Sequence, residues 1–173
     1  IEDKDNWFYK TVLKDLSEKM FCQEWNNYYI YHIEKEEPLP EFKLTNLWVN
    51  YQRQYEFNPI HHHNDLYSFV VFMKIPTDWR EQHALPFAAN SNAPCTSDFE
   101  FRYTTMLGDI ERHTYHLDKQ SEGRMLFFPA KLKHAVHPFY NCDKERISIS
   151  GNIRFDISEN AMKQFRLGKY KEL

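Results

Sequence analysis

The sequence predicts a mainly β protein, an antiparallel sandwich or barrel for which the jelly roll is the leading candidate, with helices packed on one face. Apolar residues repeat every three or four positions near the N-terminus, and from residue 41 short segments alternate or run apolar between turns. Hydrophobic residues make up 42% of the chain, enough for a core. We therefore expect one domain over residues 1–173, with a helical layer (1–40), a jelly-roll core (41–156) and a C-terminal helix (157–173).

The helical layer is predicted by one apolar stripe, which continues or restarts as a second short helix between residues 25 and 33. Pro38 and Pro40 then end the helical region and begin an extended one. The stripe consists of Trp7, Phe8, Val12, Leu13, Leu16, Met20 and Phe21.

Six to eight strands are expected in the core. Residues 66–75 form an almost continuous apolar run, as a strand buried on both faces would. Residues 76–97 contain three prolines and are expected to form a long loop. The strand segments are 43–57, 66–75, 98–107, 110–118, 123–130 and 145–155.

Composition excludes several classes of protein. The net charge is −3 and the basic residues are scattered, which argues against a dedicated nucleic-acid binder. No apolar run is long enough to span a membrane, so we expect no membrane partner. Cys22, Cys95 and Cys142 are widely spaced and form no CxxC pair, which indicates a reducing, cytoplasmic location. The sequence specifies no oligomeric state, a homodimer being one that it allows.

The histidines are the residues that indicate a metal site most directly. His61, His62 and His63 are consecutive and are followed closely by Asp65. Residues i and i+2 of an extended chain point the same way, so His61 with His63, or His63 with Asp65, can converge on one point. Two such ligands and a third from a distant strand would form a facial metal triad with open positions. The alternative is an exposed histidine-rich loop.

The C-terminal third adds a second group of polar residues. The segment 123–139 (GRMLFFPAKLKHAVHPF) contains a Gly turn, a strand and a Pro turn before His134. In the following strand Arg146, Ser148 and Ser150 share one face. An arginine with a hydroxyl beside it suits a carboxylate ligand. The alternative is an ordinary strand whose polar face lies in water.

The order of these motifs resembles that of the Fe(II)/2-oxoglutarate-dependent oxygenases, especially the prolyl-hydroxylase-like branch and small bacterial and phage oxygenases. The shared stretches are residues 48–76 and 123–153, together about 60 of the 173 residues. The second is the more specific, because its FPA-x(3)-H-x-V-x-P run and its arginine match in order and spacing. The resemblance implies a double-stranded β-helix (a cupin-like jelly roll) with iron at its mouth.

The resemblance also implies roles for individual residues. His134, directly after the Phe-Pro turn, takes the distal-histidine position, and Arg146 assisted by Ser148 binds the distal carboxylate of 2-oxoglutarate. Tyr51, ten residues before His61, corresponds to a tyrosine that hydrogen-bonds the same carboxylate. No catalytic residue is expected beyond the metal ligands.

Two frames compete for the first ligand pair, because the usual family motif is His-x-Asp or His-x-Glu. The frame His61 and His63 gives three neutral imidazoles with His134, and it is slightly favoured because small phage and bacterial relatives share His-x-His here. The frame His63 and Asp65 includes a carboxylate. In the first frame Asp65 could still bind the metal or support the other ligands.

The activity implied by the resemblance uses Fe(II), 2-oxoglutarate and O2 to couple oxidative decarboxylation to oxidation, expected as hydroxylation, of an unidentified protein, peptide or small-molecule substrate. The loop 76–97 and the segment 107–123 are where substrate-selecting elements are expected. Two alternatives stay open: a cupin-like metalloenzyme that does not use 2-oxoglutarate, and a non-catalytic jelly-roll binding module.

Overall fold

The computed structural model describes residues 1–24 and 40–158. Contacts group these residues into two units, one of residues 48–151 and one that combines residues up to 47 with those from 152 onward. The predicted helical segment 25–33 and nearly all of the predicted C-terminal helix lie outside the described residues. In the described parts of the chain, no helix has both the length and the apolarity that crossing a membrane requires.

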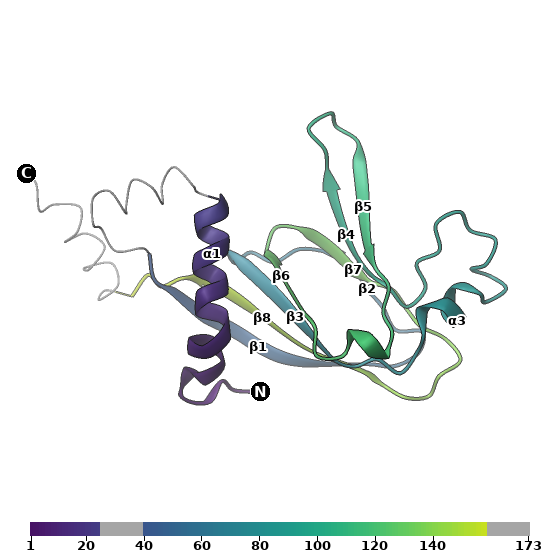
Figure 1. Ribbon diagram of the computed structural model, residues 1–173, viewed down its shortest axis with the longest axis horizontal. Coiled ribbons are helices and arrows are strands. Elements are labelled where there is room, and N and C mark those ends of the chain that lie inside the picture. Colours follow the sequence, from purple (N-terminus) through teal and green to yellow (C-terminus); the bar gives the residue numbers. More distant parts are fainter. Residues whose placement is uncertain (25–39, 159–173) are drawn as a thin grey trace, which may run out of the picture. The chain divides into compact units, whose positions relative to one another are not determined.

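The strands form two four-stranded sheets, in the orders β1-β8-β3-β6 and β2-β7-β4-β5 (Figure 1). In four of the neighbouring pairs the strand numbers add to nine, as in one long hairpin folded over on itself. That arrangement is a jelly roll, so the predicted fold class is confirmed. The strands are β1 (Phe42–Gln52), β2 (Asn58–His61), β3 (Tyr67–Lys74), β4 (Phe99–Thr104), β5 (Ile110–Tyr115), β6 (Met125–Pro129), β7 (Lys133–Val136) and β8 (Arg146–Phe155).

Three short elements differ from the sequence-based expectation. The strand β2 contains Pro59 and lies between the predicted strands 43–57 and 66–75; a proline is tolerated here because β2 lies at the edge of its sheet. The strand β7 has only four residues and follows the predicted strand 123–130. The helix α3 (Trp79–His83) interrupts the expected loop, and it forms because the Asp78 carboxylate accepts a hydrogen bond from the Arg80 amide at 2.8 Å.

The core of the unit 48–151 combines side chains from both sheets. Residues 67–70 of β3 are all buried, as the continuous apolar run predicts. Their neighbours in the core come from β4, from β6 and from the segment after β5. The buried cluster contains Val70, Phe72, Ile75, Phe99, Phe101, Leu117 and Phe128.

The other unit contains the N-terminal helix α1 (Lys14–Glu24), which follows a 3-10 turn (Lys4–Asn6) and a π-helical turn (Tyr9–Leu13). The Phe21 ring packs edge-on against Phe42 and Phe155, each at 5.7 Å between centroids. Leu13 is also buried, whereas Trp7 is 64% exposed. The predicted stripe is therefore only partly buried, because a π-helical turn has an extra residue that shifts the facing side chains.

Candidate metal and cofactor site

A cavity of about 650 Å³ lies within the unit 48–151 and is lined by strands of both sheets. Two groups of polar side chains line it. One consists of the imidazoles of His61, His63 and His134, and the other contains Arg146 and Ser148. The jelly roll therefore brings His61 and His63 close to His134, which lies about 70 residues further along the sequence, and to Arg146 beyond it.

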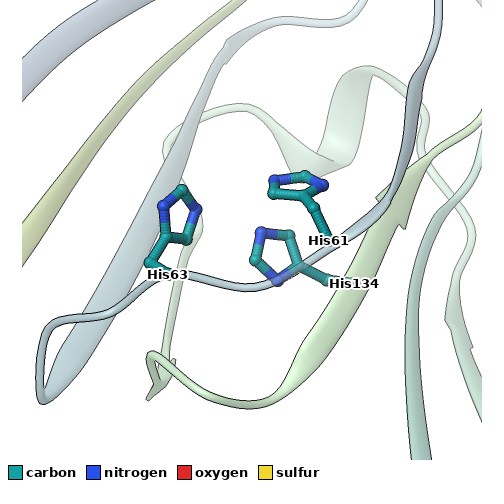
Figure 2. Close-up of side chains that lie close together, drawn as sticks. All are labelled: His61, His63 and His134. Carbon is teal, nitrogen blue, oxygen red and sulfur yellow. The ribbon is translucent and has the colours of Figure 1, made fainter.

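The three imidazoles converge because of strand pairing. His61 ends β2 and lies opposite His134 of β7 in an antiparallel pair. His63 follows two residues later, and its amide donates to the Ala130 carbonyl at 2.8 Å. One ring nitrogen of each histidine lies within 4.8 Å of the others, and the three rings face one another (Figure 2). His62 points elsewhere and is exposed, as the alternation of an extended chain requires.

Backbone carbonyls orient two of these rings. The Nδ1 of His61 lies 2.7 Å from the Pro59 carbonyl, and the Nδ1 of His134 lies 2.9 Å from the Leu132 carbonyl. A carbonyl only accepts, so each Nδ1 carries the proton and leaves the Nε2 lone pair available to a metal.

Burial also lowers the pKa of two of the imidazoles, those of His134 and His63. The pKa of His134 is lowered to about 4, mainly because its ring is withdrawn from water, and the neighbouring His61 and His63 lower it further. Burial likewise lowers the pKa of His63. Metal ligation requires the neutral form of histidine, so these two side chains are prepared for it at neutral pH.

The structure separates the other candidate ligands from this group. Among the described residues the three-histidine group includes no carboxylate, and Asp65 lies outside it. The charge of Asp65 still raises the pKa of His63, so it is close enough to act electrostatically. His137, three residues after His134, lies outside the group, and its Nε2 lies 3.0 Å from Glu100 Oε2.

Arg146 is 3% exposed, and hydrogen bonds fix the two Nη atoms of its guanidinium. Its Nη2 donates to the Ser97 carbonyl at 2.8 Å and to Ser97 Oγ at 2.6 Å, while Nη1 lies 3.3 Å from Gln52 Oε1. Its Nε has no hydrogen-bond partner, and no described carboxylate lies within ion-pair distance of Arg146. Burial lowers the pKa of Arg146 to about 10, and the charge of Asp98 opposes this shift.

Sequence reasoning missed the residues of β1 that support this group. Asn50 Nδ2 donates to Ser150 Oγ at 3.2 Å and lies 3.4 Å from Ser148 Oγ, while Gln52 contacts Arg146. The signal was available, because Asn50 and Gln52 alternate with Tyr51 along the strand. Tyr51 lines the cavity but is 60% exposed.

The comparisons with known proteins agree with this geometry. The model of the family described as "Putative 2OG-Fe(II) oxygenase" matches residues 46–152, more than half of the chain. These residues include every cavity-lining side chain named above. No curated protein matches the sequence.

Several solved structures are similar to this chain. The capsular polysaccharide assembling protein CapF from Staphylococcus aureus is 12% identical over 70% of this chain, with a TM-score of 0.35. The matched part is only 29% of the CapF chain. A cupin domain protein from Bordetella pertussis Tohama I is 17% identical, with a TM-score of 0.33, over 68% of this chain and 94% of its own.

The extent of the family match and the position of the matched residues around one cavity lead to one conclusion. This chain belongs to the 2OG-Fe(II) oxygenase family.

Proposed function

We propose that this protein is an Fe(II)- and 2-oxoglutarate-dependent oxygenase that oxidises an unidentified substrate. The observation that carries the proposal is the presence, in one cavity, of three converging imidazoles and a buried arginine with an unpartnered N–H. The family match supports the same activity. A set of metal ligands alone would suit many metalloenzymes. The buried arginine is therefore the more informative of the two observations about the use of 2-oxoglutarate.

The three histidines fit a first-row transition metal. Imidazole nitrogens are common ligands of Fe(II), and three of them on one side leave positions for co-substrates. We assign the metal to His61, His63 and His134, the frame in which the ligand atoms are gathered. Bound Fe(II) and 2-oxoglutarate would supply the oxidising chemistry, in which O2 is reduced as 2-oxoglutarate is decarboxylated.

Arg146 fits the distal carboxylate of 2-oxoglutarate. A buried N–H without an acceptor costs about 1–3 kcal/mol, and a carboxylate oxygen in the cavity would remove that cost. The same carboxylate would supply the anion that the buried guanidinium lacks. Ser148 lines the cavity two residues along the same strand and offers a hydroxyl. Tyr51, at an exposed part of the lining, stays a candidate contact to this carboxylate.

The protein itself would contribute in two ways: it would position the cofactor, and it would exclude water from the cavity. Ser97 and Gln52 fix the guanidinium, so the cofactor would meet a preorganised anchor. Phe69, Phe128 and Val136 give the cavity an apolar wall. Such a wall strengthens the electrostatic contacts made inside it.

The test is an anaerobic titration of Fe(II)-loaded protein with 2-oxoglutarate. The recorded signal is the visible charge-transfer absorption of a 2-oxo acid chelated to Fe(II). Wild-type protein should develop the absorption. Arg146→Gln should weaken 2-oxoglutarate binding by roughly 10- to 150-fold, because a hydrogen bond to a charged group contributes about 1.5–3 kcal/mol. Arg154→Gln is the matched control, because Arg154 is an exposed arginine of the same strand, and its affinity should be that of wild type.

Each contrary outcome points to a different function. If metal binds but no absorption develops, a cupin-like metalloenzyme without 2-oxoglutarate replaces the proposal; the carboxylate-free ligand set favours this as the second candidate. If no metal binds, the cavity belongs to a non-catalytic jelly-roll module. If Arg146→Gln and Arg154→Gln bind equally well, Arg146 is not the anchor.

A further inference from the structure

A second group of potential metal ligands lies outside the lining of the cavity, within the same unit. His83 ends α3, Asp98 immediately precedes β4 and His116 immediately follows β5. The His83 Nε2 and the His116 Nδ1 lie 2.9 Å and 3.1 Å from the same oxygen, Asp98 Oδ2. One ligand atom from each residue lies within 4.8 Å of the others.

We propose that His83, Asp98 and His116 form a second metal site, specific for a divalent transition ion such as Zn²⁺ and separate from the proposed iron site. Two imidazoles and one carboxylate are a donor set that such ions prefer. Unlike the three histidines of the cavity, this group contributes a negative charge. The site does not depend on the proposed oxygenase function.

The distances are close to those around a shared ion. Zinc–nitrogen bonds of about 2.0–2.1 Å and zinc–oxygen bonds of about 2.0–2.2 Å place neighbouring ligand atoms of a tetrahedral ion roughly 3.3–3.5 Å apart. The two nitrogen–oxygen distances, 2.9 Å and 3.1 Å, are shorter by a few tenths of an ångström, so the side chains would move apart slightly to hold the ion. Without a metal, the same pairs are hydrogen bonds from imidazole N–H groups to the carboxylate, which is the alternative that an experiment must distinguish.

The carboxylate itself favours a cation. Asp98 is fully buried, and its second oxygen, Oδ1, has no hydrogen-bond partner among the described residues. A buried carboxylate oxygen without a donor is costly, and both imidazoles are directed at the other oxygen. A metal ion coordinated by this carboxylate would compensate its negative charge.

Neighbouring side chains hold both imidazoles in place. The indole of Trp79 stacks on His116 at 4.4 Å between centroids with an interplanar angle of 19°, and it meets His83 edge-on at 5.3 Å. Arg80 covers the same indole at 4.5 Å and pairs with the Asp78 and Asp118 carboxylates. Preset ligand orientation lowers the entropic cost of binding a metal.

The proposed site is linked to Arg146 through the neighbouring residue Ser97. Asp98 follows Ser97, whose carbonyl and hydroxyl both accept hydrogen bonds from Arg146. Ser97 has a φ of +73°, a left-handed conformation that is unfavourable for a residue with a side chain. A metal held by Asp98 would therefore stabilise the turn that positions Arg146, which gives the second ion a structural role.

The experiment measures how many Zn²⁺ ions the full, untagged chain retains after removal of bound metal, incubation with Zn²⁺ and dialysis. Wild-type protein should retain two ions and His116→Gln one. His116 is chosen because its side chain is 43% exposed, so replacing it should leave the fold intact, whereas Asp98 is buried. His113→Gln, which changes an exposed histidine of β5, is the matched control and should retain two.

A second variant isolates the new site from the cavity. His61→Ala/His63→Ala removes two ligands of the first group and should retain one Zn²⁺ ion. Co²⁺ bound to this variant should show an absorption spectrum that disappears when His116→Gln is added. Retention of no ion by the double variant, or of equal amounts by wild type and His116→Gln, would overturn the proposal. Neither result would bear on 2-oxoglutarate binding, so the two proposals fail separately.

Discussion

Three consecutive histidines occupy different environments because a β-strand alternates its faces. His61 and His63 turn toward His134, whereas His62 is exposed. We predict that His63→Ala weakens Fe(II) binding at the cavity by at least about 10-fold, because even the loss of a residue that only supports a metal ligand costs about 10- to 100-fold in affinity. His62→Ala is the matched control and should bind like wild type. The measurement is a competition titration with a chromophoric chelator.

A variant of Asp65 distinguishes the two possible ligand sets experimentally. Asp65→Asn keeps the size of the side chain and removes its charge. Because Asp65 lies outside the three-histidine group, we predict that this variant retains Fe(II) with nearly unchanged affinity. Loss of the metal in Asp65→Asn with retention in His61→Ala would instead support the frame that uses His63 and Asp65.

Gln52 should act on the cofactor through Arg146. Its Oε1 lies 3.3 Å from Arg146 Nη1, and its own amide points toward the Glu56 and His137 carbonyls. Loss of one such hydrogen bond costs about 0.5–1.5 kcal/mol, so Gln52→Ala should raise the Kd for 2-oxoglutarate roughly 2- to 12-fold without changing Fe(II) affinity. Gln54→Ala is the matched control, because Gln54 bonds Asp143 instead. Equal affinities in the two variants would contradict the positioning role.

At the scale of elements, an aromatic cluster fixes the N-terminal helix within its unit. Phe21 of α1 is 4% exposed and packs on Phe42 and Phe155, whose rings stack at 5.4 Å. Phe21→Ala should lower the free energy of unfolding by about 3–5 kcal/mol, as removal of a buried ring does. Trp7→Ala, near the start of the same helical region but 64% exposed, should change it by less than about 0.5 kcal/mol. Urea denaturation followed by circular dichroism would measure both.

Tyr9 gives the same unit a dependence on alkaline pH. Its hydroxyl donates to the Phe42 carbonyl, and burial, reinforced by Glu18, Glu41 and Asp156, raises the Tyr9 pKa from 10.0 to about 12. The folded state therefore favours the protonated phenol. Its contribution to stability is complete below pH 10 and is lost as pH rises from 10 toward 12.

Tyr9→Phe should isolate that contribution. The variant removes the titrating hydroxyl, so its free energy of unfolding should fall less between pH 9 and about 11.5 than that of wild type. At neutral pH it should be less stable by about 1 kcal/mol, the value of one hydrogen bond. Identical alkaline profiles for the two proteins would show that Tyr9 does not contribute. Chemical denaturation at a series of pH values supplies the measurement.

At the scale of the whole molecule, ligand binding should stabilise the fold in two steps. A ligand at 100 times its Kd stabilises the folded state by about 2.7 kcal/mol, if the unfolded chain does not bind it. We predict that the melting temperature rises with Fe(II) under anaerobic conditions and rises again with 2-oxoglutarate. Arg146→Gln should retain the first increase and lose the second, while Arg154→Gln should retain both. A second increase in Arg146→Gln equal to that of wild type would contradict the role of Arg146.

Much of the fold followed from local patterns in the sequence. Alternation and the apolar run 66–75 predicted the main strands, and the three-to-four spacing predicted the N-terminal helix. The short strands β2 and β7 and the helix α3 were not predicted as separate elements, because four or five residues carry too little periodic signal. Pro59 and the three prolines of the loop 76–97 also favoured irregular structure at β2 and α3.

By itself, the sequence determined the jelly-roll fold class, the family resemblance and the histidines and arginine to examine, since these depend on residue type, order and spacing. Only the tertiary structure decided which side chains meet: His61 rather than Asp65 with His63 and His134, and Gln52 and Ser97 around Arg146. It also joined His83, Asp98 and His116, which lie in the expected loop 76–97 and in the two predicted strand segments 98–107 and 110–118. The physical reason is that convergence across strands is set by register and by loop paths, whereas sequence spacing constrains only neighbours on one strand.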